Sequence, residues 1–195
     1  LTGYHRELFI NGDRLVVFTE NNEEVYGFMQ YDIVPRPIYK QKTHAYVYDI
    51  SDRKDPKIIK DYDVKGNYQT SRMIGDYVYT IVQDNVYYYG GYLDTPVVRE
   101  SAKAIVSPEI YYFDVPDSNY NFNTVMSFNL KNEDEKPVAE TYMMGYSSVI
   151  FVSENNIYIS YQKTMPYSYY DRYNEQRFYD VVVPLLPDTI REEAK

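Results

Sequence analysis

The sequence contains no cysteine and no tryptophan among its 195 residues. The absence of cysteine excludes disulfide bonds, thiolate chemistry, cysteine zinc sites and iron–sulfur clusters. It does not exclude an extracellular location, because a large hydrophobic core needs no covalent cross-links. Positive charge is also scarce, since 20 lysines and arginines stand against 29 aspartates and glutamates, and the net charge is −9. A surface of that sign repels phosphate backbones, so the charge excludes a nucleic-acid-binding role.

Long apolar runs are missing as well. No run approaches the roughly 18 apolar residues of a membrane-spanning helix, and no signal peptide is visible. The chain begins at Leu1 rather than at methionine, from which we expect a processed segment of a longer polypeptide. Any export signal or membrane anchor would then lie outside this sequence.

Tyrosine is the abundant residue, with 26 copies, and apolar residues make up 44% of the chain. That apolar fraction is sufficient for a packed core and argues against disorder. Tyrosine favours strands, and it also favours surfaces that combine apolar contact with hydrogen bonding. A chain of 23.2 kDa fits one domain or a piece of a larger one. We therefore expect a mainly β fold.

Turn signals between apolar runs predict three similar hairpins. In the first two, Gly12-Asp13 and Gly75-Asp76 separate two strand-like runs, because glycine accepts the positive φ of a tight turn. In the third, residues 154–156 separate the runs 149–152 and 157–161. Three copies of one pattern indicate an internal repeat.

The repeat is longer than a hairpin, because flanking strands recur too. Ile50 and Leu130 are 80 residues apart and Tyr79 and Tyr158 are 79 apart, so the second unit maps in register onto the third. Four strands per unit can be drawn, which is the content of a propeller blade. We predict a partial β-propeller of about two and a half four-stranded antiparallel blades. The predicted parts are a partial blade over 1–51, a blade over 52–131, a blade over 132–187 and a short C-terminal helix over 188–195.

These units are too long for ordinary blades, which take about 40–50 residues. The excess lies in three stretches of weak pattern, over 21–42, 83–124 and 162–187. All three fall at the same point of the repeat, so we expect long loops that emerge on one face. Long loops gathered on one face commonly form a binding surface or a lid.

Four segments of the chain carry a resemblance to a known family, and they are Tyr4–Val17, Val47–Gly66, Ser71–Tyr79 and Ser153–Ile159. They resemble a family of secreted archaeal and bacterial proteins with a C-terminal β-propeller domain. The resemblance implies export to the cell surface or outside, and it brings no catalytic residues with it. It also implies that the rest of the propeller belongs to the parent chain.

A part of a propeller leaves sheet faces uncovered, because each blade is buried by its neighbours. Free strand edges add to this exposure. We therefore expect this segment to associate with itself or to be only marginally stable as a monomer.

Aromatic side chains beside carboxylates in the inserted stretches are the candidate ligand-binding residues. Tyrosine rings can lie against sugar rings or peptides while carboxylates accept hydrogen bonds, although the same tyrosines could simply pin the loops onto the blades. Hard oxygen ligands for Ca²⁺ are available at Asp114, Asp117 and Asn119, without the spacing of an EF-hand. The candidate ligand-binding tyrosines are Tyr87, Tyr88, Tyr89, Tyr92, Tyr111, Tyr112, Tyr169, Tyr170 and Tyr173.

Other polar positions favour structural roles. Asp49 and Asn129 share one repeat position and are expected to cap the following turn. His5 and His44 lie far apart with no partner at metal-ligand spacing. No HExxH, P-loop, GxGxxG or GxSxG motif occurs.

These observations favour a non-enzymatic extracellular or cell-surface module that binds a glycan or a protein or acts as a scaffold, with no cofactor required. The alternative is a propeller-type polysaccharide hydrolase or lyase, which needs a carboxylate pair or a tyrosine nucleophile. A third possibility is a purely structural spacer. Acidic side chains that converge from two strands would favour the enzyme, whereas loops packed flat without a pocket would favour the spacer.

Overall fold

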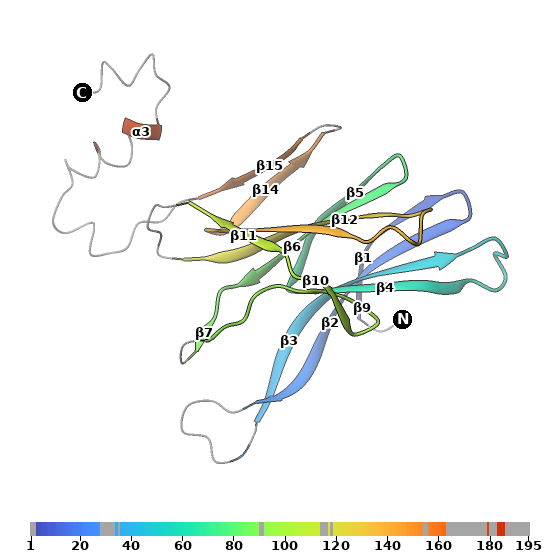
Figure 1. Cartoon of the computed structure of the whole chain (residues 1–195), viewed down its shortest axis with the longest axis horizontal. Helices are drawn as coiled ribbons and strands as arrows, with labels where there is room; N and C mark the ends of the chain where they lie inside the picture. Colours follow the sequence, from blue (N-terminus) through green and yellow to red (C-terminus); the bar gives the residue numbers. More distant parts are fainter. Residues whose placement is uncertain are drawn as a thin grey trace.

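A computed structural model describes residues 3–27, 34, 36–89, 92–113, 117, 119–153, 156–162, 179 and 183–185. These residues form a mainly β structure in which most neighbouring strands run antiparallel (Figure 1). Helix is limited to the short α3 (Val183–Leu185) within the described part. No helix among the described residues is long and apolar enough to cross a membrane.

The first sheet has six strands in the order β1-β2-β3-β4-β9-β10. Its first four strands follow one another along the chain, whereas β9 and β10 come from a later segment and extend the β4 edge. The strands are β1 (Tyr4–Asn11), β2 (Arg14–Gly27), β3 (Arg36–Asp49), β4 (Lys57–Lys65), β9 (Val98–Glu100) and β10 (Lys103–Val106).

The second sheet has five strands in the order β11-β13-β12-β6-β5. Its edge strand β11 runs parallel to β13, while the other pairs are antiparallel. The strands are β5 (Asn67–Ile74), β6 (Tyr77–Asn85), β11 (Glu109–Tyr112), β12 (Asn121–Asn129) and β13 (Val138–Met144).

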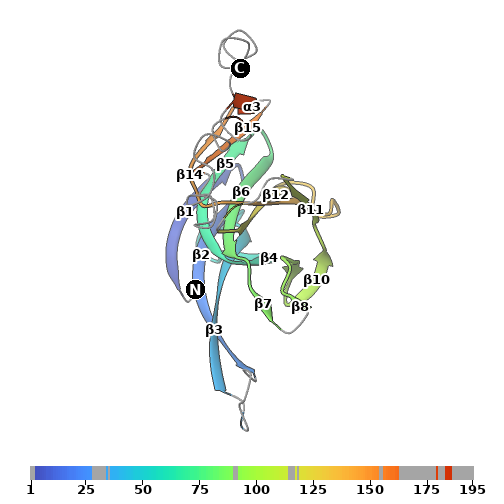
Figure 2. The same cartoon turned by 90° about the vertical axis from the view of Figure 1, so that its left-hand side faces the viewer.

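A hairpin of β14 (Ser147–Val152) and β15 (Ile157–Tyr161) follows the second sheet, and β7 (Tyr88–Tyr89) pairs with β8 (Tyr92–Leu93) in a small ribbon. Figure 1 shows the β14–β15 hairpin, the second sheet and the first sheet in succession, and Figure 2 shows the hairpin and the long end of β3 at opposite extremes. The described residues thus form two blade-like sheets followed by a two-stranded hairpin, and they form no closed ring.

The two glycine-aspartate corners lie against each other, as a stacked repeat requires. Gly12 and Gly75 have φ values of 63° and 60°, which suit glycine, and a Cβ at either position would meet nothing within 4 Å. The Asn11 amide donates hydrogen bonds to Gly75 O at 3.1 Å and to Asp76 Oδ1 at 2.8 Å. The prediction of stacked repeats is confirmed for these two units.

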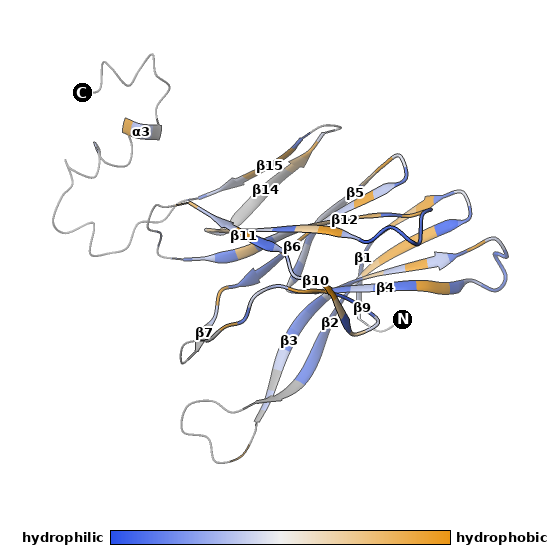
Figure 3. Cartoon of the chain, viewed as in Figure 1, coloured by the Kyte–Doolittle hydropathy of each residue, from blue (hydrophilic) through white to orange (hydrophobic). Residues whose placement is uncertain are grey.

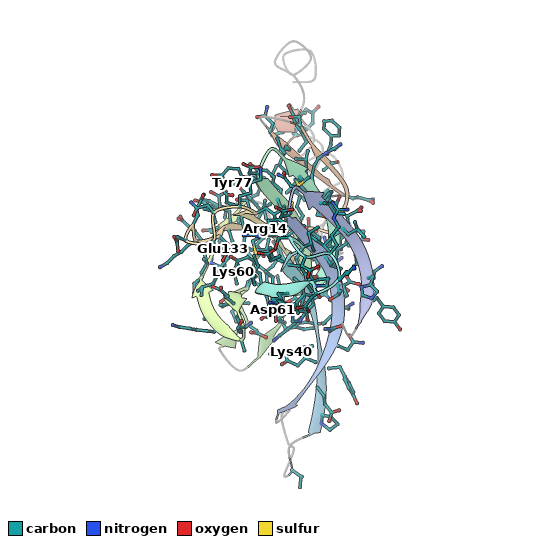
Figure 4. The ribbon with its side chains drawn as sticks, turned by 90° about the vertical axis from the view of Figure 1, so that its right-hand side faces the viewer. Arg14, Lys40, Lys60, Asp61, Tyr77 and Glu133 are labelled. Carbon is teal, nitrogen blue, oxygen red and sulfur yellow. The ribbon has the colours of Figure 1, made fainter. Side chains whose placement is uncertain are left out.

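The turns that follow the third strand of each unit are also equivalent. Asp49 Oδ1 accepts a hydrogen bond from Ser51 N at 2.8 Å, and Asn129 Oδ1 accepts one from Lys131 N at 3.0 Å. The predicted capping role of Asp49 and Asn129 is therefore confirmed. Arg14 joins the two units here, because its guanidinium lies 2.8 Å from Glu133 Oε1 (Figure 4).

The hydrophobic core lies between the facing surfaces of the first and second sheets. Tyr62 and Phe128 pack across it with ring centroids 5.1 Å apart. Apolar colour in Figure 3 concentrates on the strands, while the turns after β3 and β12 are hydrophilic. The buried core residues are Val16, Phe18, Ala45, Val47, Tyr62, Val64, Val78, Val82, Val98, Met126, Phe128, Leu130 and Ala139.

Gly66 carries the chain from the first sheet to the second. Its φ is 123°, and a Cβ there would lie 2.6 Å from Gln83 O. Its N–H donates to Gln41 O at 2.8 Å, and its carbonyl accepts the Thr43 hydroxyl at 3.0 Å. Only a residue without a side chain allows the two sheets to approach this closely.

The structure corrects three expectations about organisation. Within 21–42, residues 21–27 and 36–42 extend a long antiparallel ribbon of β2 and β3, because the two strands pair from Arg14 and Asp49 out to Gly27 and Arg36. Residues 83–124, expected as a loop insertion, supply β7 to β11 and so contribute strands to both sheets. The sheets divide at Gly66 rather than between 51 and 52, because β4 pairs with β3.

Two other expectations lie wholly or largely beyond the described residues. The helix over 188–195 is outside them. Of the insertion over 162–187, only Gln162, Tyr179 and 183–185 are described. The long connections that are described leave the strands at the end opposite the glycine-aspartate corners (Figure 1).

Candidate functional site

The edge of the second sheet places one predicted tyrosine, Tyr111, beside a tyrosine that the sequence analysis did not select, Tyr142. Strand β11 pairs in parallel with β13, so Glu109 lies beside Glu140 and Tyr111 lies beside Tyr142. Adjacent parallel strands are about 4.8 Å apart, and residues at matching positions point to the same face. Four side chains of two chemical types therefore form a two-by-two patch, which we call the tyrosine–glutamate patch.

Each tyrosine in the patch is tied to the glutamate on its own strand. Tyr111 Oη donates to Glu109 Oε2 at 3.0 Å, and Tyr142 Oη donates to Glu140 Oε2 at 2.7 Å. The two rings stack with centroids 5.6 Å apart at 26°. The hydrogen bond to Glu140 raises the pKa of Tyr142 to about 12, and the bond to Glu109 raises the pKa of Tyr111. Both phenols therefore stay protonated at neutral pH and act as hydrogen-bond donors.

A cleft of about 410 Å³ opens beside this patch, between the second sheet and the β14–β15 hairpin. Phe113 stacks on Tyr161 at one end of it, with ring centroids 5.9 Å apart. An apolar cleft with a few polar groups at its margin is the usual form of a ligand site. The cleft is lined by Tyr79, Phe113, Val125, Ser127, Val138, Ala139, Glu140, Tyr142, Met144, Ile157 and Ile159.

The other predicted tyrosines that the structure describes lie outside this patch. Tyr112 is 67% exposed on β11, while Tyr88, Tyr89 and Tyr92 belong to the separate β7–β8 ribbon. Tyr87 lies under Lys65, whose Nζ is 5.8 Å from the ring centroid. The remaining predicted tyrosines, Tyr169, Tyr170 and Tyr173, lie outside the described residues.

Lys65 itself belongs to a partly buried charge network that joins the two sheets. Its Nζ is 2.8 Å from Asp84 Oδ2 and 2.9 Å from Asp94 Oδ2, and Lys40 reaches the same Asp94 oxygen at 2.8 Å. Burial raises the pKa of Asp84 despite the bond to Lys65. The position of Tyr87 beside this network favours a structural role, in which Tyr87 holds its segment against the sheets, over a role in ligand binding.

The predicted calcium ligands are partly engaged in local turns. Asp117 Oδ1 accepts a hydrogen bond from Asn119 N at 3.3 Å, and Asp117 N donates to Tyr120 Oη at 2.8 Å. Asp114 lies outside the described residues. Across the part of the chain that is described, no group of three or more histidine, aspartate and glutamate side chains is placed to hold a metal ion.

A second, charged pocket of about 550 Å³ lies on the face of the first sheet that points away from the second sheet. Lys42 Nζ lies 2.6 Å from Glu23 Oε2, and His44 Nδ1 lies 3.0 Å from Asp61 Oδ1. The hydrogen bond from Lys42 is the main cause that lowers the pKa of Glu23. Sequence analysis missed this pocket, although the continuous polar run at 40–44 and the alternating polar residues at 61–65 were a usable signal.

Comparison with known proteins gives one family. The family model described as a beta propeller domain matches residues 1–185. Neither the curated proteins nor the solved structures contain a match to the chain.

Proposed function

Because the chain belongs to the β-propeller domain family, we propose that it is a non-enzymatic binding module at the cell surface or outside the cell, with a glycan as its ligand. The extracellular placement rests on the resemblance of the repeated segments to secreted propeller proteins. The observation that carries the ligand class is the tyrosine–glutamate patch beside the 410 Å³ cleft.

The chemistry of the patch suits a sugar. Stacked phenol rings offer an apolar surface to the C–H face of a pyranose, and the neighbouring carboxylates accept hydrogen bonds from its hydroxyls. Tyr111 is 42% exposed and Glu140 is exposed, so both are available to a ligand without rearrangement. The cleft beside Tyr142, with a volume of about 410 Å³, provides space for a further ring of a glycan chain.

Binding can be tested by screening the chain on a glycan array and measuring the best ligand by calorimetry. We expect Tyr111→Ala to weaken binding about tenfold, which corresponds to about 1.4 kcal/mol. Tyr77→Ala is the matched control, because Tyr77 also donates to a glutamate, Glu135, at 3.0 Å. Tyr77 lies at the other end of the strands, since it pairs with Asn129 of β12 whereas Tyr142 pairs with Asn123. Equal effects of the two substitutions, or no glycan bound at all, would contradict the proposal.

Incubating the chain with the best-binding glycan also tests the alternative, a polysaccharide hydrolase. The observation that favours it is the side-by-side placement of Glu109 and Glu140 on two strands. Release of reducing sugar ends that disappears in Glu140→Gln would support hydrolysis. A tyrosine nucleophile is disfavoured, because a phenol with a pKa of about 12, as at Tyr142, is hardly ionised at neutral pH.

A further inference from the structure

The first glycine-aspartate corner contains the only asparagine-glycine pair in the sequence, Asn11-Gly12. Asparagine is a chemically labile residue, and its side-chain amide is lost most readily when glycine follows, because glycine has no side chain to obstruct the approach of its backbone nitrogen. Gly12 is exposed, and a Cβ there would meet nothing within 4 Å, so the turn is open to solvent. The second corner has Ile74 before Gly75 and therefore lacks this chemistry.

Deamidation at this pair needs no reactant other than water. The Gly12 backbone nitrogen gives up its proton to water or hydroxide and attacks Cγ of the Asn11 side chain. The new N–Cγ bond closes a succinimide ring, the Cγ–Nδ2 bond breaks, and Nδ2 takes up a proton and leaves as ammonia. Water then adds to one of the two ring carbonyls and cleaves its bond to nitrogen, which gives aspartate or isoaspartate at position 11.

The amide that would be lost is held by the second corner. Asn11 Nδ2 donates to Gly75 O at 3.1 Å and to Asp76 Oδ1 at 2.8 Å. Lys131 Nζ lies 2.7 Å from the same Asp76 oxygen, and the hydrogen bonds from Lys131 and Asn11 hold the pKa of Asp76 below its usual value. Asp76 is therefore an ionised, strong acceptor at neutral pH. Because these bonds fix the Asn11 side chain in one orientation, they restrict the rotation that brings its Cγ onto the Gly12 nitrogen.

The product of the reaction cannot make the same contact. A carboxylate at position 11 has no N–H to donate, and it would face two acceptors, the Gly75 carbonyl and the ionised Asp76. Lys131 would then have two carboxylates beside it instead of one. Isoaspartate also adds a carbon atom to the backbone at the turn, where Asn11 pairs with Arg14. The chemistry thus converts an attraction between the two repeat units into a repulsion.

We propose that Asn11-Gly12 is a site of spontaneous deamidation, that the hydrogen bonds to the second corner slow the reaction, and that its completion removes this contact irreversibly. The contact joins the first and second sheets within one chain, so the proposal holds whatever else packs on the outer faces of these sheets. It is also independent of glycan binding, which uses β11 and β13. The corner contact is a latch that can open many times but reacts only once.

Mass spectrometry tests both the site and its restraint, using the full chain incubated at neutral pH for several weeks and then digested with trypsin. Cleavage after Arg6 and Arg14 releases residues 7–14, in which Asn11 is the one asparagine. We expect this peptide to gain the mass of an oxygen in place of an NH group, and an isoaspartate-specific methyltransferase to label it. In guanidinium chloride, which unfolds the chain, conversion should run at least about tenfold faster because the contact is absent.

Asp76→Ala isolates the contribution of the corner contact. It removes one acceptor of the Asn11 amide, so conversion in the folded chain should run about threefold faster. Asp134→Ala is the matched control, because Asp134 is an exposed aspartate in the turn after β12, and it should leave the rate unchanged. Circular dichroism would show that both variants remain folded. An unchanged rate in Asp76→Ala, or equal rates in the folded and unfolded chains, would overturn the restraint, and an unconverted peptide from the unfolded chain would overturn the site.

The consequence of the reaction is tested with Asn11→Asp, which places the charge of one product at the corner. We expect a lower urea midpoint than for the unaltered chain, and a smaller loss at high salt because ions screen the repulsion. Asn132→Asp is the matched control, since it adds the same charge where the side-chain oxygen accepts a hydrogen bond from Asp134 N at 3.3 Å, a role that a carboxylate keeps. Equal midpoints for the two variants would show that deamidation does not remove the contact, which would overturn this part of the proposal.

Discussion

Replacing Glu20 by alanine would test the contact that ties the first sheet to the second. The Glu20 side chain is only 1% exposed. Its Oε1 accepts a hydrogen bond from the backbone N–H of Tyr68 at 2.5 Å, and its Oε2 accepts one from Arg6 Nε at 2.6 Å. The carboxylate thus joins β1, β2 and the edge strand of the second sheet.

The expected cost follows from what each partner loses. The N–H of Tyr68 would be left without its acceptor in a partly buried position, which costs about 1–2 kcal/mol. The Arg6 side chain is 45% exposed, so water can solvate it, and the lost ion pair adds at most about 1 kcal/mol. The Glu20→Ala variant should therefore lose about 1–3 kcal/mol of unfolding free energy. Glu20→Gln keeps an acceptor for Tyr68 and should lose only about 1 kcal/mol.

Urea unfolding followed by circular dichroism measures both values, with Glu24→Ala as the control because Glu24 is exposed on the same strand. We expect that control to change the midpoint very little. If the alanine and glutamine variants unfold within about 0.5 kcal/mol of each other, the bond to the Tyr68 N–H contributes nothing and the reasoning fails.

Two further predictions concern the junction between the sheets. Gly66→Ala should lower the free energy of unfolding by more than about 2 kcal/mol, because the φ of 123° is unfavourable for alanine and the added Cβ would lie 2.6 Å from a carbonyl oxygen. Gly12→Ala should lower it by only about 1 kcal/mol, because the φ there is 63° and the space around the added Cβ is open. Urea midpoints that rank the two variants in the opposite order would refute this prediction. Burial acts to lower the pKa of Lys65, but its bonds to two aspartates outweigh burial and the pKa lies above the usual 10.5. The charged Lys65 therefore stabilises the fold fully below pH 10.5, and this stabilisation is lost as the pH rises through the folded-state pKa. Lys65→Met should make the urea midpoint fall less steeply at alkaline pH. An unchanged slope would contradict this prediction.

The hairpins and their spacing could be predicted because their signals are local. A glycine-aspartate pair between two alternating runs specifies a tight turn, and the turn fixes the register of the strands beside it. The corners at Gly12 and Gly75, and the caps formed by Asp49 and Asn129, lie where the repeat placed them.

The boundaries between the sheets could not be predicted from local sequence signals. An alternating strand such as β4 satisfies its pattern in either neighbouring sheet, and only its pairing with β3 assigns it to the first. The stretch 83–124 lacks strong periodicity because β9, β10 and β11 are three or four residues long and lie at edges. Their partners are far away in sequence, so no local pattern identifies them.

The candidate site, too, could be predicted from the sequence only in part. Sequence analysis selected Tyr111 for its aromatic and acidic surroundings, but Tyr142, Glu109 and Glu140 were not selected. Their spacing within each strand is visible, whereas the parallel pairing of β11 with β13 is not.

The sequence by itself determined the strand-rich composition, the absence of thiol chemistry, the repeated corners and the membership of residues 1–185 in a propeller family. Only the tertiary structure decided which strands share a sheet, that residues 21–27 and 36–42 pair in a ribbon, and that two tyrosines and two glutamates meet beside a cleft. The physical reason is that turns and side-chain alternation are properties of neighbouring residues. The choice of a strand's partner is instead made by backbone hydrogen bonds and burial between residues distant along the chain.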